Sequence, residues 1–126
     1  MEKEHEELMV DIEREFSPIL ENSTQNIYIY LDDNHKICNE NFASLLGFSS
    51  AKEWSGSKGS FTDLFVNENS KEALISAYRL AMEKREGSNI SVEWKDKSGN
   101  VIKTSVILVP VSLKGELFAL HFISKI

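Results

Sequence analysis

The chain has 126 residues, of which 41% are hydrophobic, and it contains only six Gly and two Pro. These values are typical of one globular domain and exclude a long disordered chain. The formal charge of −6 provides no basic patch, so neither nucleic acid nor a membrane surface is expected as a direct partner. The single Cys excludes an internal disulfide, and no apolar run is long enough to cross a bilayer, so we expect a cytoplasmic location.

Residues 1–16 are predicted to form an amphipathic flanking helix, and residues 17–126 the domain itself. Leu8, Ile12 and Phe16 are spaced to share one stripe of an otherwise charged helix. Such a stripe must be buried against another surface, either the domain's own sheet or a second copy of the chain. The Ser17-Pro18 pair predicts a break in the helix, because Ser is a good N-cap and Pro suits a first helical turn.

The middle of the chain alternates short strands and short helices. Residues 26–32 and 36–38 are predicted strands, joined by the turn-forming run Asp33-Asn34-His35. Asn39 is a good N-cap for a helix that ends at Gly47. Further helical turns are expected over residues 50–54 and 61–66.

The C-terminal half contains the longest predicted elements. The main helix is expected over residues 70–85, with an apolar face that includes Leu74 and Tyr78. Residues 89–126 then form three apolar runs of period two, separated by Gly-containing turns. This pattern predicts three antiparallel strands joined by hairpins, which is wide enough to anchor a small domain.

Several motifs in this order resemble those of PAS domains. Residues 39–48, Asn-Glu-Asn-Phe-Ala-Ser-Leu-Leu-Gly-Phe, resemble the family's "N-x-x-F-x-x-L-L-G-Y" helix, and residues 31–37 resemble its first hairpin. Residues 63–69 are similar to its "D-L-x-H-P-x-D" segment, and residues 94–99 to its "K-D-G" hairpin. The resemblance covers about Ser17 to Ile126. The chain departs from the pattern at His35, Asn67, Asn69, His121 and Lys125.

The resemblance implies an α+β fold and a role in signalling. The expected sheet has five antiparallel strands in the order 2-1-5-4-3, with helices on one face and the flanking helix on the other. The expected function is a sensory or dimerisation module of a signal-transduction protein, such as a sensor histidine kinase of a two-component system. It would transmit the state of a ligand or partner through its flanking helix and catalyse nothing itself. A homodimer and further domains of a larger signalling protein are the expected partners.

Two arguments disagree about which face of the last strand is inside. Hydrophobicity alone would bury Phe118, Leu120 and Phe122 against the helices, and a shift of one residue exchanges the two faces. The family comparison instead turns Ala119 and His121 inward. We favour this second register, since it leaves an apolar outer surface for the flanking helix to cover. The outer surface would then also include Tyr28 and Tyr30. The predicted helix or dimer interface comprises Leu8, Ile12, Phe16, Ile107, Val109, Phe118, Leu120 and Phe122.

The same register defines a candidate ligand pocket. It comprises Phe61, Leu74, Tyr78, Trp94, Thr104, Val106, Leu108 and His121. His121 either fills space as a structural histidine or forms a hydrogen bond with a carboxylate or carbonyl of an unknown small molecule. Haem is disfavoured because residues 70–85 contain no His, and covalently bound flavin because residues 60–66 contain no Cys. No cofactor is therefore predicted.

No catalytic or metal-binding motif is visible. His5, His35 and His121 lie on different predicted elements without ligand-like spacing, so no metal site is expected. The Asp32-Asp33 pair is interpreted as a solvated turn, and Cys38 as a small buried residue.

Two alternatives stay open: a structural PAS domain with a filled core that serves only dimerisation or docking, and a small cone-shaped α+β enzyme. The enzyme would need an inward carboxylate in an apolar pocket, and none is predicted.

Overall fold

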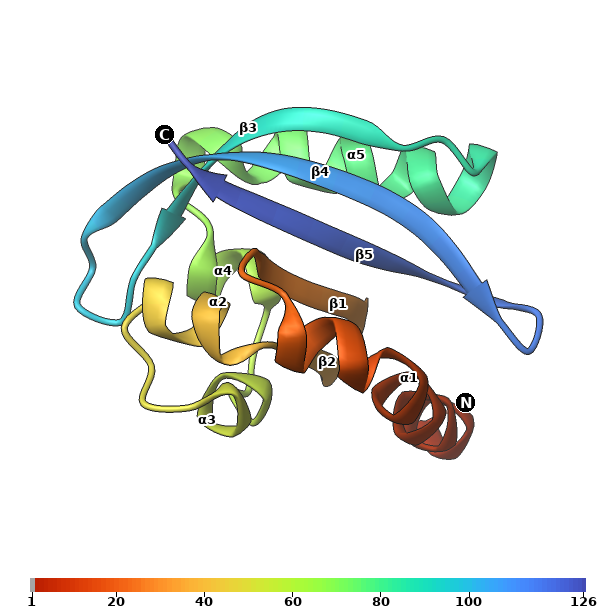
Figure 1. The fold of residues 1–126 in the computed structure, drawn as a ribbon. Coiled ribbons are helices and arrows are strands. Elements are labelled where there is room, and N and C mark those ends of the chain that lie inside the picture. The colour runs from red at the N-terminus through yellow and green to blue at the C-terminus, as the bar shows by residue number, and fades with distance from the viewer. Residues whose placement is uncertain (1) are drawn as a thin grey trace.

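The computed structural model describes residues 2–126, with side chains from Lys3 onward. Its centre is one antiparallel sheet in the order β2-β1-β5-β4-β3, which confirms the predicted topology and α+β class. The three C-terminal strands are long and curved (Figure 1). The strands are β1 (Asn26–Asp32), β2 (His35–Cys38), β3 (Ser88–Lys95), β4 (Val101–Leu113) and β5 (Glu116–Lys125).

Helices contribute to a separate core on each face of the sheet. The inner core combines residues of the sheet with residues of the four helices in the middle of the chain, and the outer core combines the sheet with α1. A 3₁₀ turn, Glu68–Ser70, leads into α5. The helices are α1 (Glu2–Asn22), α2 (Glu40–Leu45), α3 (Ala51–Ser55), α4 (Phe61–Phe65) and α5 (Lys71–Lys84). Among the described residues, no helix is both long and apolar enough to cross a membrane.

Aromatic side chains fill most of the inner core. The rings of Phe42, Trp54, Phe65 and Trp94 are almost fully buried, and Phe42 stands edge-on to both Trp residues with ring centroids 5.3–5.5 Å apart. Asn39 fixes α2 at the edge of this core, since its Oδ1 accepts hydrogen bonds from the backbone amides of Phe42 and Ile27. Close aromatic packing of this kind contributes strongly to stability through buried area.

The last strand adopts the register in which His121 faces inward. Ala119 and Ile123 belong to the inner core, whereas Phe118 and Leu120 are buried in the outer core. Phe122 packs against the outer core and does not reach the interior.

The predicted outward orientation of Tyr28 and Tyr30 is wrong. In the β1–β5 pair, Tyr28 lies opposite His121 and Tyr30 lies opposite Ala119. Directly opposite residues of antiparallel strands share a face, so an inward His121 requires an inward Tyr28. The outward residues of β1 are instead Ile27, Ile29 and Leu31.

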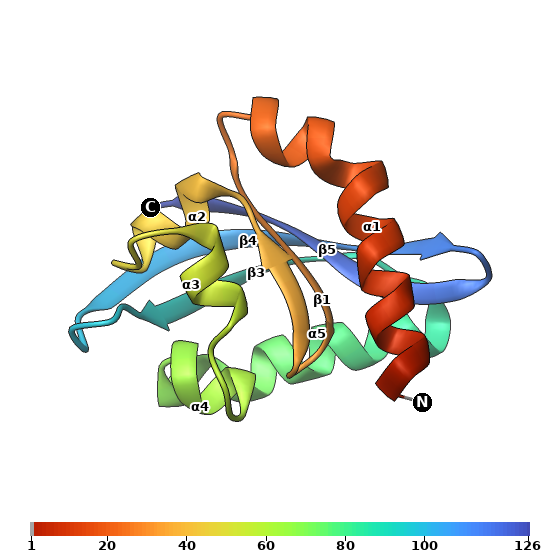
Figure 2. The same ribbon diagram turned by 90° about the horizontal axis from the view of Figure 1, so that it is seen from below.

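The flanking helix covers the outer face of the chain's own sheet. It lies between the β1–β2 strands and the β4–β5 hairpin (Figure 2) and contacts both. Ile12 is fully buried and Leu8 nearly so, and Phe16 meets Phe118 edge-on with ring centroids 5.7 Å apart. Asp11 binds Lys114 of the hairpin at 2.8 Å, which adds a polar contact at the same interface.

The predicted break at Ser17 is also wrong, because α1 continues through Pro18 to Asn22. Proline has no N–H, so it cannot donate the usual helical hydrogen bond to the carbonyl of Arg14. The Ser17 hydroxyl donates to that carbonyl instead, at 3.4 Å. Asn22 Nδ2 donates to the Pro18 carbonyl at 2.9 Å and satisfies an acceptor at the end of the helix.

Candidate functional site

A cavity of about 260 Å³ lies between β1, β5, the start of α4 and α5. Its walls are mostly aromatic and aliphatic, with a few polar groups among them, which is the usual composition of a small-molecule site. The exposed residues Ile75 and Ser60 belong to its lining, so the cavity communicates with solvent. The lining residues are Tyr28, Tyr30, Asp33, Ser60, Phe61, Thr62, Leu74, Ile75, Tyr78 and His121.

Half of the predicted pocket residues meet at this cavity. Phe61, Leu74, Tyr78 and His121 line it. Trp94, Thr104, Val106 and Leu108 are buried in the inner layer of the sheet but do not line it.

The Thr104 hydroxyl takes part in a chain of hydrogen bonds within the inner layer of the sheet. Its hydroxyl accepts a hydrogen bond from Trp94 Nε1 at 2.8 Å and donates to the Val92 carbonyl at 2.8 Å. Trp94 therefore has its polar atom satisfied within the core, and neither residue presents a free polar group to a ligand.

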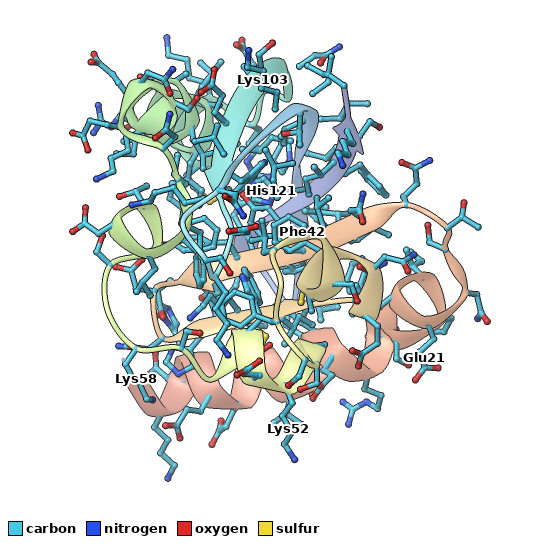
Figure 3. The ribbon with its side chains drawn as sticks, turned by 90° about the vertical axis from the view of Figure 1, so that its left-hand side faces the viewer. Glu21, Phe42, Lys52, Lys58, Lys103 and His121 are labelled. Atoms are coloured by element: carbon cyan, nitrogen blue, oxygen red, sulfur yellow. The ribbon has the colours of Figure 1, made fainter. Side chains whose placement is uncertain are left out.

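His121 is the central polar group of the cavity. It comes from the middle of β5 and lies in the interior of the molecule (Figure 3). It is 2% exposed. Its ring stacks on the Tyr28 ring with centroids 3.8 Å apart and planes 9° apart. Burial lowers the pKa of His121 to about 3, opposed in part by the backbone of Tyr28 and Ala119, so the imidazole is neutral at physiological pH.

The Nδ1 atom of His121 is buried and makes no hydrogen bond of normal geometry among the described residues, although the backbone of Tyr28 and Ala119 lies close enough to affect its pKa. An unsatisfied buried nitrogen costs on the order of 1–3 kcal/mol, so it marks a place where a partner is expected. Trp54 Nε1 is also buried without a partner, but Trp54 does not line the cavity. Among the described residues, His121 is thus the one cavity-lining residue with a buried nitrogen that lacks a hydrogen-bond partner.

Asp33 forms a polar corner of the same cavity. Its Oδ1 accepts hydrogen bonds from the Tyr30 hydroxyl at 2.8 Å and from the Phe61 amide at 3.1 Å. The β1–β2 turn is thereby tied to the first residue of α4. Burial raises the pKa of Tyr30 well above its usual range, and the hydrogen bond to Asp33 raises it further, so the phenol stays protonated as a donor.

Asp32, the preceding residue, faces the opposite side of the sheet. Its carboxylate accepts hydrogen bonds from His35, from the amide of Asn34 and from His5 of α1. The predicted turn is present at Asp33 and Asn34, but the two carboxylates are not simply solvated: each is partly buried, one against the flanking helix and the other at the cavity. Asp32 is the last residue of β1 and Asp33 the first residue of the turn, where the chain brings its side chain toward α4.

Lys36 holds the same hairpin against the region of α3. Its amine is buried and donates to the carbonyls of Asp33 at 2.8 Å and Ser57 at 3.0 Å. The amine also lies 5.7 Å from the centre of the Trp54 ring. Burial lowers the pKa of Lys36, while Asp33 partly opposes that shift.

Sequence reasoning missed Tyr28, Tyr30 and Asp33 as cavity residues and His5, Asp32 and His35 as a cluster. The pairing of β1 with β5 could have identified Tyr28, because it follows from an inward His121. The meeting of His5 with Asp32 depends on where α1 lies on the sheet, which no local pattern encodes.

The predicted interface residues fall into two groups. Leu8, Ile12, Phe16, Phe118, Leu120 and Phe122 form the contact between α1 and the sheet. Ile107 and Val109 of β4 lie outside that contact, and Ile107 is 49% exposed. Val10 and Ile19 of α1 are exposed as well.

Comparison with known proteins gives matches at the level of structure. No protein-family model and no curated protein matches the sequence. A PAS domain from Colwellia psychrerythraea has a TM-score of 0.69 and 16% identity, covering 91% of this chain and 97% of that chain. The PAS domain of an HTR-like protein from Haloarcula marismortui has a TM-score of 0.62 and 20% identity, covering 98% and 99%. A PAS domain from a two-component sensor histidine kinase has a TM-score of 0.66 and 9% identity, covering 93% and 99%.

The fold and the site together define a class: an antiparallel sheet with helices that close a small cavity on one face and a helix docked on the other. The chain has the PAS fold, as its sequence motifs predicted. Identities this low establish the fold and not the function.

Proposed function

We propose that this chain is a sensory module of a signal-transduction protein, and that a small molecule bound beside His121 changes how α1 packs on the sheet. The observation that carries the proposal is that His121, which lines a cavity of about 260 Å³, has a buried Nδ1 without a hydrogen-bond partner among the described residues. The proposal is supported by the PAS domain of a sensor histidine kinase among the similar structures.

The size of the cavity limits the ligand. A cavity of about 150 Å³ is known to bind benzene, so the present volume suits a molecule on the order of ten non-hydrogen atoms. Haem and covalently bound flavin stay disfavoured: α5 carries no His, and Cys38 is not part of the cavity wall. Burial also raises the pKa of the Cys38 thiol to about 12, so it is not a reactive thiolate.

The charge of the lining limits the ligand further. Asp33 is an acidic group in the lining, which contains no Lys or Arg among the described residues. His121 is neutral and forms hydrogen bonds without providing a positive charge. We therefore infer an uncharged or cationic ligand and not one that carries a carboxylate. One polar group of the ligand would lie toward His121 and an apolar body against Phe61 and Leu74.

The β1–β2 hairpin offers a route from ligand to helix. Asp33 contacts the cavity through Tyr30 and Phe61, and Asp32 contacts α1 through His5. A ligand that pulls Tyr30 or Asp33 would move the backbone that also carries Asp32. Such a ligand shifts the helix only if it binds the two packings with different affinities.

We further propose that the chain forms a homodimer within a larger signalling protein and does not itself catalyse a reaction. The exposed apolar side chains of Ile107 on β4 and of Val10 and Ile19 on α1 itself support a further contact.

The structural alternative has support of its own. The inner core is filled with aromatic rings, and the cavity is slightly below the range of about 300–1,000 Å³ that is usual for ligand pockets. In that case the domain would serve docking or dimerisation alone.

The enzyme alternative is less well supported. It needs a carboxylate that is available to a substrate, whereas Asp33 Oδ1 is engaged by the Tyr30 hydroxyl and the Phe61 amide.

Native mass spectrometry of protein purified without added ligand tests the proposal. We expect a mass increment from one small molecule per chain, a dimer mass, and release of the molecule on denaturation. The test variant is His121→Phe, which keeps a ring to stack on Tyr28 but removes both nitrogens, and it should lower retention of the molecule at least tenfold. The control is Phe48→Leu, which lies outside the lining and should leave retention unchanged.

Absence of any bound molecule from freshly purified wild-type protein, with a dimer still present, would favour the structural alternative. Equal retention by wild type and His121→Phe would show that the His121 nitrogen is not the recognition group.

A further inference from the structure

Three side chains capable of binding a metal ion meet where α1 crosses the β1–β2 hairpin. His5 comes from α1, Asp32 is the last residue of β1, and His35 is the first residue of β2. Nδ1 of His5 lies 2.5 Å from Oδ2 of Asp32, and Nδ1 of His35 lies 2.7 Å from Oδ1. One potential ligand atom from each residue lies within 4.8 Å of the others.

Small movements of these side chains would give the ligand spacing of a tetrahedral metal site. Ligand atoms about 2.0–2.1 Å from one ion in tetrahedral geometry lie about 3.3 Å from each other. The two nitrogen–oxygen distances would therefore have to lengthen by less than about 1 Å, which rotation of the His5 and Asp32 side chains can provide. Both side chains are partly exposed, at 27% and 35%, so they are free to adjust.

We propose that His5, Asp32 and His35 form a binding site for one divalent transition metal ion of the Zn²⁺ class. Two imidazoles favour Zn²⁺, Ni²⁺ or Co²⁺ over Mg²⁺ and Ca²⁺, which prefer oxygen ligands. The exposed side of the site leaves room for a water molecule as the fourth ligand.

The electrostatics of the site suit a cation. Asp32 contributes a carboxylate whose two oxygens face the imidazoles of His5 and His35. Glu4, Glu6 and Glu7 flank His5 in the sequence and add negative charge to this end of α1, which favours the approach of a cation.

The bound ion would fasten the first turns of α1 to the hairpin. His5 is the sole ligand from the helix, whereas Asp32 and His35 belong to adjoining strands that pair with each other. The metal would thus add an inter-element crosslink to the existing apolar contact of Leu8 and Ile12. This inference concerns metal binding and helix docking and does not depend on a ligand beside His121.

The test is a titration of the untagged, EDTA-treated and dialysed chain with Zn²⁺ by calorimetry, and with Co²⁺ by visible absorption. We expect one ion per chain, ligand-field bands of four-coordinate Co²⁺, and slower hydrogen exchange of the α1 amides when Zn²⁺ is bound. His5→Gln keeps a hydrogen-bonding side chain toward Asp32 but removes the imidazole. It should weaken binding at least tenfold, as should His35→Ala. Asp11→Asn removes the other polar contact of α1, with Lys114, and should leave the affinity unchanged.

Two results would overturn the proposal. One is no stoichiometric binding at micromolar Zn²⁺, in which case the three residues form only a hydrogen-bonded contact. The other is equal affinity of wild type, His5→Gln and His35→Ala, which would place the ion elsewhere. Circular dichroism of both variants checks that each is folded, so that loss of binding reports on the ligands.

Discussion

Replacement of Ile12 by Ala measures how firmly α1 is docked on the sheet. Ile12 is fully buried in the outer core, between α1 and the sheet. The substitution removes three buried carbon atoms, worth roughly 2.4 kcal/mol at about 0.8 kcal/mol for each. The cavity left behind adds to this, and buried Ile→Ala changes cost about 2–5 kcal/mol in total. We expect the free energy of unfolding to fall by about 3 kcal/mol.

Urea denaturation followed by fluorescence is the assay, because Trp54 and Trp94 both lie in the inner core and report on the whole domain. Val10→Ala is the matched control: it lies on the same helix, is 60% exposed and should cost less than about 0.5 kcal/mol. If Ile12→Ala costs no more than Val10→Ala, either α1 is undocked in solution or it opens independently of the domain. Hydrogen exchange of the α1 amides separates these cases, and undocking in solution would refute the packing described above.

Three other parts of the structure give separate tests. The pKa of His121 is about 3 in the folded state, against an ordinary value near 6.5, so the unfolded state binds the proton first. Stability should therefore fall as the pH drops from about 6.5 toward 3, by up to about 1.4 kcal/mol per pH unit, and His121→Phe should lose this component in urea titrations at each pH. Asn39→Ala removes two hydrogen bonds to backbone amides and should lower the free energy of unfolding by about 2 kcal/mol, whereas no loss would show that water replaces the cap. Thr104→Val strands Trp94 Nε1 and should cost about 1–3 kcal/mol, and a Trp94→Phe background should reduce that cost.

The fold was readable from the sequence because its signals are local and redundant. The Asn39 cap, the Gly47 stop and the Gly-containing turns at the ends of β4 each fix one boundary. The sequence alone left the register of β5 open, since either Phe118 or His121 could have faced the inner core. The register favoured by the family comparison is the one observed. Its physical reason is that Phe118 and Leu120 are buried against Leu8 and Ile12 in the outer core.

The site was only partly readable because it depends on long-range contacts. His121 was identified by its unusual position in a strand, but Tyr28 was placed on the wrong face for want of its partner strand. Asp32 and Asp33 resemble any polar turn in sequence, and their separate roles arise only when α1 and α4 approach from opposite sides. The continuity of α1 across Pro18 likewise depends on a side-chain hydroxyl that replaces a missing amide.

Because a side-chain hydroxyl takes the place of the missing Pro18 amide, α1 is held together more weakly at this point than elsewhere along its length. The hydroxyl of Ser17 holds the Arg14 carbonyl at 3.4 Å, a longer and more easily exchanged bond than a backbone amide gives. Residues 3–16 carry most of the apolar contact with the sheet, including Leu8 and Ile12. Leu20 also packs there, and residues 23–25 join the helix to β1. Bending of α1 at Pro18 would therefore release residues 3–16 from the sheet, while residues 19–22 and β1 stay in place.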